Sequence, residues 1–259
     1  MVPGEPAHDT EYAPYTRCYC EENVYALLNL LVNPISLRQE CSDTAERVTK
    51  DDERHYAVFV SNNDHACVLF QQSASTRGPQ QLNAVIWDYH VFAVSVLMPP
   101  SSSTAMRAET EAVTERHATS SHRATVIVRD ADSLLENPTA LTRYVNESFR
   151  PDLFEQGFLP RNLERIVPAT AFLDNFASDR SHMLAEKLHR GASSTAKEYI
   201  QPPPAHDPIC GRLARQRNEQ HNLWTRFLDM RTTAEGGNED SDQYGVVVDG
   251  VRDLLDFEW

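Results

Sequence analysis

The stretch VIWDYHVFAVSVL, residues 85–97, is the strongest strand signal in the chain and decides the fold. It is rich in valine and aromatic residues, which favour β-strands. The tract 99–122 that follows contains mostly Ser, Thr, Ala and Glu with almost no large apolar side chain, so we expect a flexible insertion. A strand pattern returns in TVIV at 125–128. Two strands on either side of one connection predict a hairpin with a long tip.

The rest of the chain mixes helical and strand patterns. Apolar residues recur at 24, 27, 28 and 31 on one helical face, and Asn33-Pro34 ends that helix. Further strands are predicted at 56–60, 67–70 and 246–248, and a closing turn follows the last of them. An extended segment is predicted at 166–172, and helices are predicted at 139–149, 176–188 and 222–230. The helix at 176–188 is predicted from a capping signal at Ser178 or Asp179. Because helices and strands do not alternate regularly, we expect an α+β fold.

Length and charge narrow the class of protein. The chain has 259 residues and a net charge of −14, which argues against nucleic acid or anionic membrane as the main partner. No apolar run approaches membrane-spanning length, and the N-terminus does not resemble a secretory signal, so we expect a cytosolic or nuclear protein. In such a reducing compartment the five cysteines are free thiols. We expect a disordered lead at 1–13 and one domain at 14–259, with flexible insertions near 41–54 and 99–122.

Cys20 lies at the start of the first predicted helix, four residues before Val24 on its buried face. The reactive form of cysteine is the thiolate, which the positive end of a helix dipole favours. The neighbouring carboxylates Glu21 and Glu22 oppose it. Position alone favours a buried structural cysteine over a nucleophile, because free cysteine is among the most buried residue types.

His90 is a polar residue in the middle of the strongest strand signal. Strand alternation predicts that Asp88, His90 and Phe92 share one face. Asp130 ends the next strand, and if the two strands pair its carboxylate can orient the imidazole, as thiol hydrolases require. The alternatives are a hydrogen-bonded core histidine and, for Asp130 and Asp132, aspartates that form a turn after the strand.

Several longer segments occur in a distinctive order. They are CYCEENVY at 18–25, YAVFVSN at 56–62, VIWDYHV at 85–91 and FLDNFASDRSHM at 172–183, followed by Pro202-Pro203-Pro204 and Ile209. In these segments, between Arg17 and Ile209, the chain resembles protein N-terminal glutamine amidohydrolases. Several long motifs of rare residues in register are more specific than any one short pattern.

The resemblance implies a catalytic triad and a fold. Cys20 would be the nucleophile, His90 the base and Asp130 the acid, while Asp132 is the alternative acid because the residues flanking Asp130 differ from the family's Tyr and Leu. The implied fold is a papain-like or transglutaminase-like cysteine hydrolase core, in which helices pack on a mainly antiparallel sheet. The domain at 14–259 would then be catalytic.

The resemblance also implies an activity. The protein would deamidate N-terminal glutamine of proteins or peptides to glutamate and release ammonia, without a metal or cofactor, and so feed the N-degron pathway. The implied partners are proteins or peptides with N-terminal glutamine and enzymes of that pathway, and we expect a monomer. Asp88 and Asp179 are candidates for binding the α-ammonium group of the substrate, although Asp179 also suits a helix cap.

Other functions remain open from the sequence. A transglutaminase-like enzyme would use the same triad to transfer the acyl group to an amine instead of water. A non-catalytic module that binds N-termini would have a broken or blocked triad. A metal site is less favoured, because Cys18 and Cys20 form one pair without a second closely spaced pair to complete a tetrahedral set.

Overall fold

An antiparallel sheet of six strands forms the centre of the computed structural model, which describes residues 13–33, 53–98, 124–157, 161–188, 195–231 and 244–259. The strand order is β10-β7-β1-β4-β5-β6, and neighbouring strands run antiparallel. The strands are β1 (Glu53–Ser61), β4 (His90–Leu97), β5 (Thr125–Arg129), β6 (Thr139–Ala140), β7 (Leu163–Pro168) and β10 (Val246–Val248).

Two small ribbons and a set of short helices surround this sheet. The ribbons pair β2 (Cys67–Leu69) with β3 (Val85–Trp87) and β8 (Leu184–Leu188) with β9 (Thr195–Tyr199). The α-helices are α1 (Cys20–Val32), α2 (Leu141–Tyr144), α3 (Pro151–Glu155), α4 (Ala169–Asn175), α5 (Arg212–Gln216) and α6 (Val251–Asp256). The 3-10 turns are η3 (Pro79–Gln81) and η6 (Ser181–Met183), and the π-helical turns are η5 (Val145–Phe149) and η7 (Leu223–Phe227).

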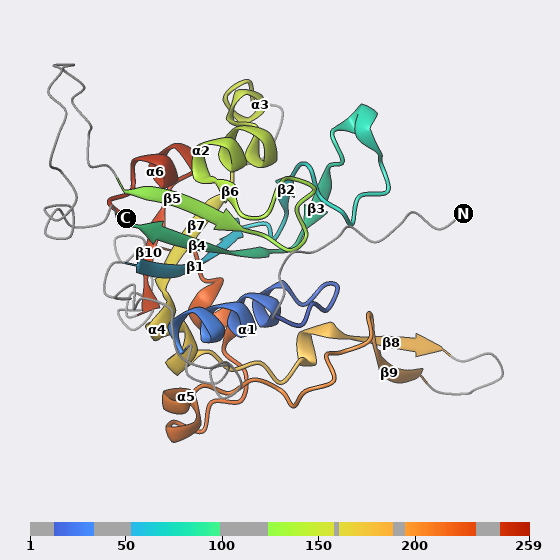
Figure 1. Ribbon diagram of the computed structural model, residues 1–259. Helices are drawn as coiled ribbons and strands as arrows, with labels where there is room; N and C mark the ends of the chain where they lie inside the picture. Colours follow the sequence, from blue (N-terminus) through green and yellow to red (C-terminus); the bar gives the residue numbers. More distant parts are fainter. Residues whose placement is uncertain (1–12, 34–52, 99–123, 158–160, 189–194, 232–243) are drawn as a thin grey trace, which may run out of the picture.

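Helices cover both faces of the sheet. Figure 1 shows α1, α4 and α5 on its lower side and α2, α3 and α6 on its upper side. Alternate residues of a strand point to opposite faces, so β4 contributes Val91 to the cluster around Val24 and Leu28, and Phe92 to the cluster around Tyr144. The strand is therefore buried from both sides, and its first residue is held rigidly at one end of the sheet.

The long helix α1 brings Cys20 to that same end of the sheet. Val24 and Leu28 are buried on its inner face, as the periodicity predicts. At its N-terminus the N–H groups of Glu22 and Asn23 both bond to the carbonyl of Tyr19. Figure 1 shows that the start of α1, the start of β4 and the end of β5 lie toward the same end of the sheet.

The predicted hairpin is confirmed, because β4 and β5 pair antiparallel from Ala93↔Arg129 to Leu97↔Thr125. Strands also form where expected in β1, β2 and β10, and helical turns form at 141–149 and 223–227. The α+β class with a mainly antiparallel sheet is thus confirmed, and the papain-like or transglutaminase-like core stays a prediction. None of the described helices combines the length and apolarity that crossing a bilayer would need.

The predicted single strand at 85–97 is wrong, because it is divided between β3 and β4 at Asp88 and Tyr89. The Asp88 carboxylate accepts a hydrogen bond from the Tyr89 N–H at 2.9 Å, and its carbonyl accepts one from the Ser61 hydroxyl at 2.8 Å. These bonds turn the backbone, so β3 joins a separate ribbon with β2. Asp88 is consequently exposed in a bend and does not share a strand face with His90.

The predicted helix at 176–188 is also wrong. Ala177 makes a β-bridge with Cys210, and after η6 the chain continues as β8. The residues taken as a helix cap form tight turns instead, because the Ser178 hydroxyl accepts the N–H of Arg180 and the Asp179 carboxylate accepts that of Ser181. Local side-chain to backbone bonds of this kind compete with helix formation.

Three further boundaries differ from the sequence-based predictions. The segment 166–172 changes from β7 to α4 at Pro168, which has no N–H to extend the sheet. The closing turn contains the helix α6, and β1 begins at Glu53, inside the loop expected near 41–54. The predicted lead at 1–13, apart from Ala13, and the predicted insertion at 99–122 lie outside the described residues.

Candidate active site

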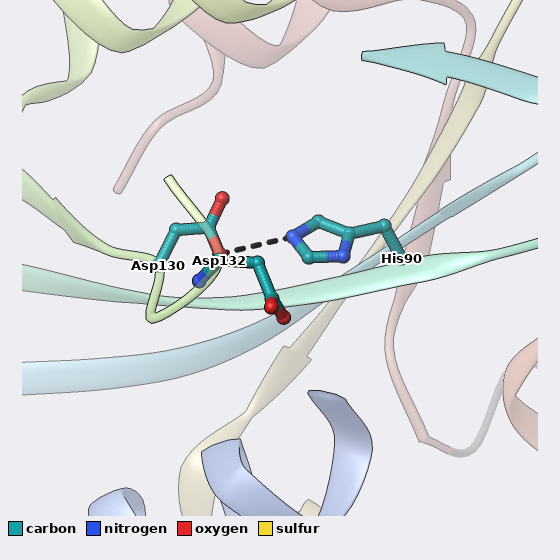
Figure 2. A group of neighbouring side chains, drawn as sticks. All are labelled: His90, Asp130 and Asp132. Atoms are coloured by element: carbon teal, nitrogen blue, oxygen red, sulfur yellow. Dashed lines mark hydrogen bonds and ion pairs between the residues drawn. The ribbon is translucent and has the colours of Figure 1, made fainter. Parts of the chain in front are cut away.

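A buried histidine and aspartate meet where β4 begins and β5 ends. His90 Nε2 and Asp130 Oδ1 are 3.0 Å apart, and their side chains are only 1% and 2% exposed. Figure 2 shows the imidazole ring directed at the Asp130 carboxylate. The antiparallel pairing of the two strands creates this contact, since it places the start of one beside the end of the other. Their assignment as base and acid stays a prediction.

The Asp130 carboxylate is fixed by three further donors. The Tyr144 hydroxyl donates to Oδ2 at 2.7 Å, and the backbone N–H of Asp132 donates to Oδ1 at 3.0 Å. The Gln72 amide lies at 3.5 Å from Oδ2. A carboxylate with this many donors keeps one orientation, and it holds Nε2 of His90 in turn. No described residue makes a hydrogen bond to His90 Nδ1, so that nitrogen is left for a reacting group.

Asp132, the alternative acid, has a different partner. Its Oδ1 accepts a hydrogen bond of 2.6 Å from the Tyr15 hydroxyl. Figure 2 marks an interaction of His90 with Asp130 and none with Asp132. The geometry therefore favours Asp130 as the residue that orients His90.

Charge and burial set the protonation of this pair. Burial lowers the pKa of His90, but the charge and hydrogen bond of Asp130, followed by the charge of Asp132, outweigh it and leave the pKa raised. Burial raises the pKa of Asp130, and the His90 charge and the hydrogen bonds overcome that effect and leave it lowered. For Asp132, burial and the Asp130 charge keep the pKa raised. The pair thus favours an aspartate beside a histidine that protonates easily.

Cys20 lies beside this pair at the first position of α1. It lines a pocket of about 30 Å³ together with Val91, Asp130 and Asp132. Burial raises the pKa of its thiol well above the usual value, the Glu21 charge adds to this, and the backbone N–H of Val91 opposes it. Within the described residues no hydrogen bond joins Cys20 Sγ to His90. Such catalytic contacts are often long before substrate binds.

A buried network that sequence reasoning missed touches the thiol. Glu21 is fully buried, and its Oε2 is 3.7 Å from Cys20 Sγ and accepts a hydrogen bond of 2.9 Å from the Tyr89 hydroxyl. His182 Nε2 lies 3.1 Å from that hydroxyl and 3.5 Å from Glu21 Oε1. The available signal was that Glu21, Tyr89 and His182 each come from a different one of the long motifs. The motifs therefore converge on one site.

Comparisons with known proteins identify the family of the chain. A family model for N-terminal glutamine amidase matches residues 15–255, nearly the whole described chain. The chain belongs to the N-terminal glutamine amidase family. A protein N-terminal glutamine amidohydrolase of Drosophila mojavensis is 33% identical over 195 residues, which cover 75% of this chain and 71% of the relative. The protein of the same name from Drosophila ananassae is 34% identical over the same shares.

A buried ion pair connects the motif at 18–25 with the motif at 172–183. Arg180 Nε and Nη2 each donate to the Glu22 carboxylate at 2.8 Å, and the two side chains are 5% and 1% exposed. Two parallel bonds of this kind fix orientation as well as distance. They hold the start of α1, and with it Cys20, against the loop before η6. Sequence reasoning treated Glu22 only as a charge opposing the thiolate.

The structure places the two candidate ammonium-binding aspartates differently. Asp88 is exposed, and its charge is the smallest of the contributions that raise the pKa of Cys20, after burial and the charges of Glu21 and Asp132. Asp179 makes an ion pair of 3.2 Å with His221 and is 41% exposed. His221 in turn stacks on His182, with ring centroids 5.4 Å apart. Asp179 thus lies at the outer end of the buried network, away from the thiol.

One group of side chains has the composition of a metal site. His90, Asp130 and Asp132 each offer one ligand atom, and these atoms lie within 4.8 Å of one another. A metal ion there would have to replace the hydrogen bond between His90 and Asp130. The two aspartates also already accept hydrogen bonds from tyrosine hydroxyls. The donor set therefore suits an imidazole and its orienting acid better than a cation.

Proposed function

We propose that this protein deamidates N-terminal glutamine in proteins or peptides by a cysteine-dependent mechanism. The observation that carries the proposal is the buried His90–Asp130 hydrogen bond of 3.0 Å beside the pocket that Cys20 lines. Membership in the N-terminal glutamine amidase family supports it, as do relatives named protein N-terminal glutamine amidohydrolase.

The proposed reaction has two steps. The Cys20 thiolate attacks the side-chain carboxamide carbon of the substrate, the carbon–nitrogen bond breaks, and ammonia leaves with a proton from His90. Water then attacks the thioester and gives a proton to His90, the carbon–sulfur bond breaks, and the peptide leaves with glutamate as its first residue while the thiol is restored. Asp130 keeps the imidazole oriented and stabilises its protonated form through both steps.

The start of α1 supplies the groups that stabilise the oxyanion. The first N–H groups of a helix have no intrahelical acceptor, and α1 has no side-chain cap. The backbone N–H of Cys20 is thus available to donate to the carbonyl oxygen as negative charge develops on it. We propose this N–H as one oxyanion donor.

The proposed product connects this reaction to a pathway of consecutive reactions. A protein whose first residue changes from glutamine to glutamate exposes a new acidic N-terminus, which suits a step of the N-degron pathway in the cytoplasm or nucleus. We propose this role on the strength of the resemblance in the motifs. Capture of the enzyme with the arginyl-transfer machinery from cytosol is the measurement that addresses it.

The first prediction concerns substrate choice. A peptide with N-terminal glutamine should release ammonia, while matched peptides with N-terminal asparagine or with glutamine at the second position should release at least about tenfold less. An ammonia assay with mass spectrometry of the peptide measures both products. Adding a lysine-containing peptide tests the transglutaminase alternative, because acyl transfer would give a cross-linked product. Equal turnover of all three peptides, or a dominant cross-link, contradicts the proposed function.

The second prediction concerns the α-ammonium group of the substrate. Asp88→Asn should raise KM for the glutamine peptide about tenfold with little change in kcat, because a charge-assisted contact to the ammonium is lost. Asp179→Asn is the matched control, since it removes an exposed carboxylate of the same kind that already pairs with His221. Steady-state kinetics on both variants decide between the two aspartates. A larger KM effect in the control would assign the role to Asp179.

A further inference from the structure

A second pocket lies on the other side of the fold from α1, among α3, β7, the turn after β10 and α6. Its volume is about 380 Å³. Apolar and polar side chains both line it, among them Phe149, Phe154, Glu155, Asn162, Glu164 and Val251. Figure 1 shows α3 and α6, which contribute residues to this pocket, on the upper side of the sheet.

The pocket is separate from the candidate active site. In the sheet register Glu164 pairs with Val60, and Val60 pairs with His90. Glu164 and His90 are therefore two strands apart, roughly 10 Å between backbones. The buried side chains of Val60 and Phe92 pack in the core on this face of the sheet. A ligand in the pocket would not touch the reacting groups.

Two buried polar side chains in the pocket have no partner. Glu164 is 0% exposed, and neither of its carboxylate oxygens makes a hydrogen bond within the described residues. Asn162 is 4% exposed, and its amide nitrogen and oxygen are likewise without a hydrogen bond among those residues. Buried polar groups are nearly always satisfied in folded proteins. Two unsatisfied side chains lining one cavity point to a ligand that satisfies them.

Among the described residues that line the pocket, no unpaired cation is present to pair with Glu164. Burial raises the pKa of Glu164 to about 8, the charges of Asp249 and Asp253 add to this, and Arg161 opposes it. The backbone N–H of Gly250 also opposes the shift, although it lies outside hydrogen-bonding geometry for either oxygen. Arg161 is 3.1 Å from Asp249 and is thus already paired. The other arginine of the pocket, Arg252, is paired with Glu155.

We propose that this pocket binds a guanidinium group carried on an apolar stem. The two free oxygens of Glu164 match the two parallel N–H donors of a guanidinium, and the Asn162 oxygen can accept a third. Phe149 and Phe154 offer apolar surface for the stem. An ammonium concentrates its charge at one nitrogen, and its three donors do not form the planar fork that matches both carboxylate oxygens at once. The group can come from an arginine side chain of a partner protein or from a small free guanidine.

The test is calorimetric titration of the full chain with N-acetyl-arginine amide. Wild type should bind it, and N-acetyl-citrulline amide, which has the same shape without the charge, should bind at least about tenfold more weakly. Glu164→Gln should weaken arginine amide binding by a similar factor. Asp152→Asn is the matched control, because this half-exposed carboxylate of α3 pairs with Arg150 and is not among the residues that line the pocket, so it should change the affinity less than about threefold. No binding to wild type, or equal binding to Glu164→Gln, overturns the proposal.

Affinity should also depend on pH, because the guanidinium binds the ionised carboxylate. Binding to wild type should strengthen as pH rises from 6.5 through about 8, the pKa that burial gives Glu164. The other charged groups that line the pocket are Glu155, Arg161, Asp249, Arg252 and Asp253, and the titratable thiol of Cys67 lies near Glu164 on β2. Affinity that does not change across this range would assign binding to the rim and refute the site.

Two further arms complete the test. Agmatine and an arginine-containing pentapeptide, compared with N-acetyl-arginine amide, distinguish a small free ligand from a side chain presented by a protein. The arginine and citrulline comparison on wild type decides the proposal even if Glu164→Gln does not fold. Peptide deamidation is not part of the readout, so this proposal and the proposed enzymatic function can fail independently.

Discussion

Replacing Cys20 by alanine should abolish ammonia release from a peptide with N-terminal glutamine, with kcat/KM reduced about 10⁴-fold or more. The thiol is the group that forms the covalent intermediate in the proposed mechanism, and alanine leaves only binding and the oxyanion donors. The side chain is small and the helix start around it is fixed by the Glu22–Arg180 pair, so the fold should survive. An ammonia assay with excess enzyme measures the residual rate.

The matched control is Cys18→Ala. Cys18 is only partly buried, comes from the same motif two residues earlier, and has no proposed role. Its loss should change kcat/KM less than about threefold. Thermal unfolding of both variants checks that folding is not the cause of any loss. Activity that persists in Cys20→Ala, or disappears equally in both variants, contradicts the assignment of the nucleophile.

The sequence predicted the hairpin that carries the site, but not the break before it. Both VIW and YHV favour strands, and only the aspartate between them favours a bend locally. The break also depends on the Ser61 hydroxyl, which bonds to the carbonyl of Asp88 from 27 residues away in the chain. The prediction of a helix at 176–188 was wrong for a related reason, because the same side-chain oxygens that cap helices also close the turns around Arg180. Local patterns do not distinguish these outcomes.

The geometry of the candidate site was predicted in part, and the structure shows the physical reasons. Strand pairing was enough to bring His90 and Asp130 together. The choice between Asp130 and Asp132 was not accessible, because it depends on which tyrosine hydroxyl each one meets. The burial of Glu21 was missed because charged residues at a helix start are usually solvated. Its partners Tyr89 and His182 come from distant motifs.

Replacing Asp130 by alanine should lower kcat/KM on the order of 10³-fold, the second largest effect that the geometry implies. The variant removes the acceptor that orients His90 and leaves Nε2 of the buried imidazole without its hydrogen-bond partner. Asp130→Asn should cost less, because an amide oxygen in the place of Oδ1 can still accept from His90 and from the N–H of Asp132. Kinetics on both variants separate orientation from charge.

The pH dependence of the asparagine variant is the sharper measurement. Deprotonated His90 is needed to accept the thiol proton, so kcat/KM of wild type should rise with pH through the pKa of His90, which the Asp130 charge holds above its usual value against the effect of burial. Asp130→Asn removes that charge, the pKa of His90 falls, and the acidic limb should move to lower pH by about 1–3 units. Thus the variant is slower at its plateau yet keeps a larger share of its plateau rate in acid.

Asp132→Asn distinguishes this effect from a general loss of negative charge. The Asp132 carboxylate also raises the pKa of His90, but only by its charge, since its hydrogen bond is to Tyr15. In the pH profile of kcat/KM for Asp132→Asn, the acidic limb should move in the same direction by a smaller amount, and the plateau should fall less than about tenfold. If Asp132→Asn instead shows the larger shift and the larger loss, then Asp132 is the acid that serves His90, and the 3.0 Å contact of Asp130 is structural.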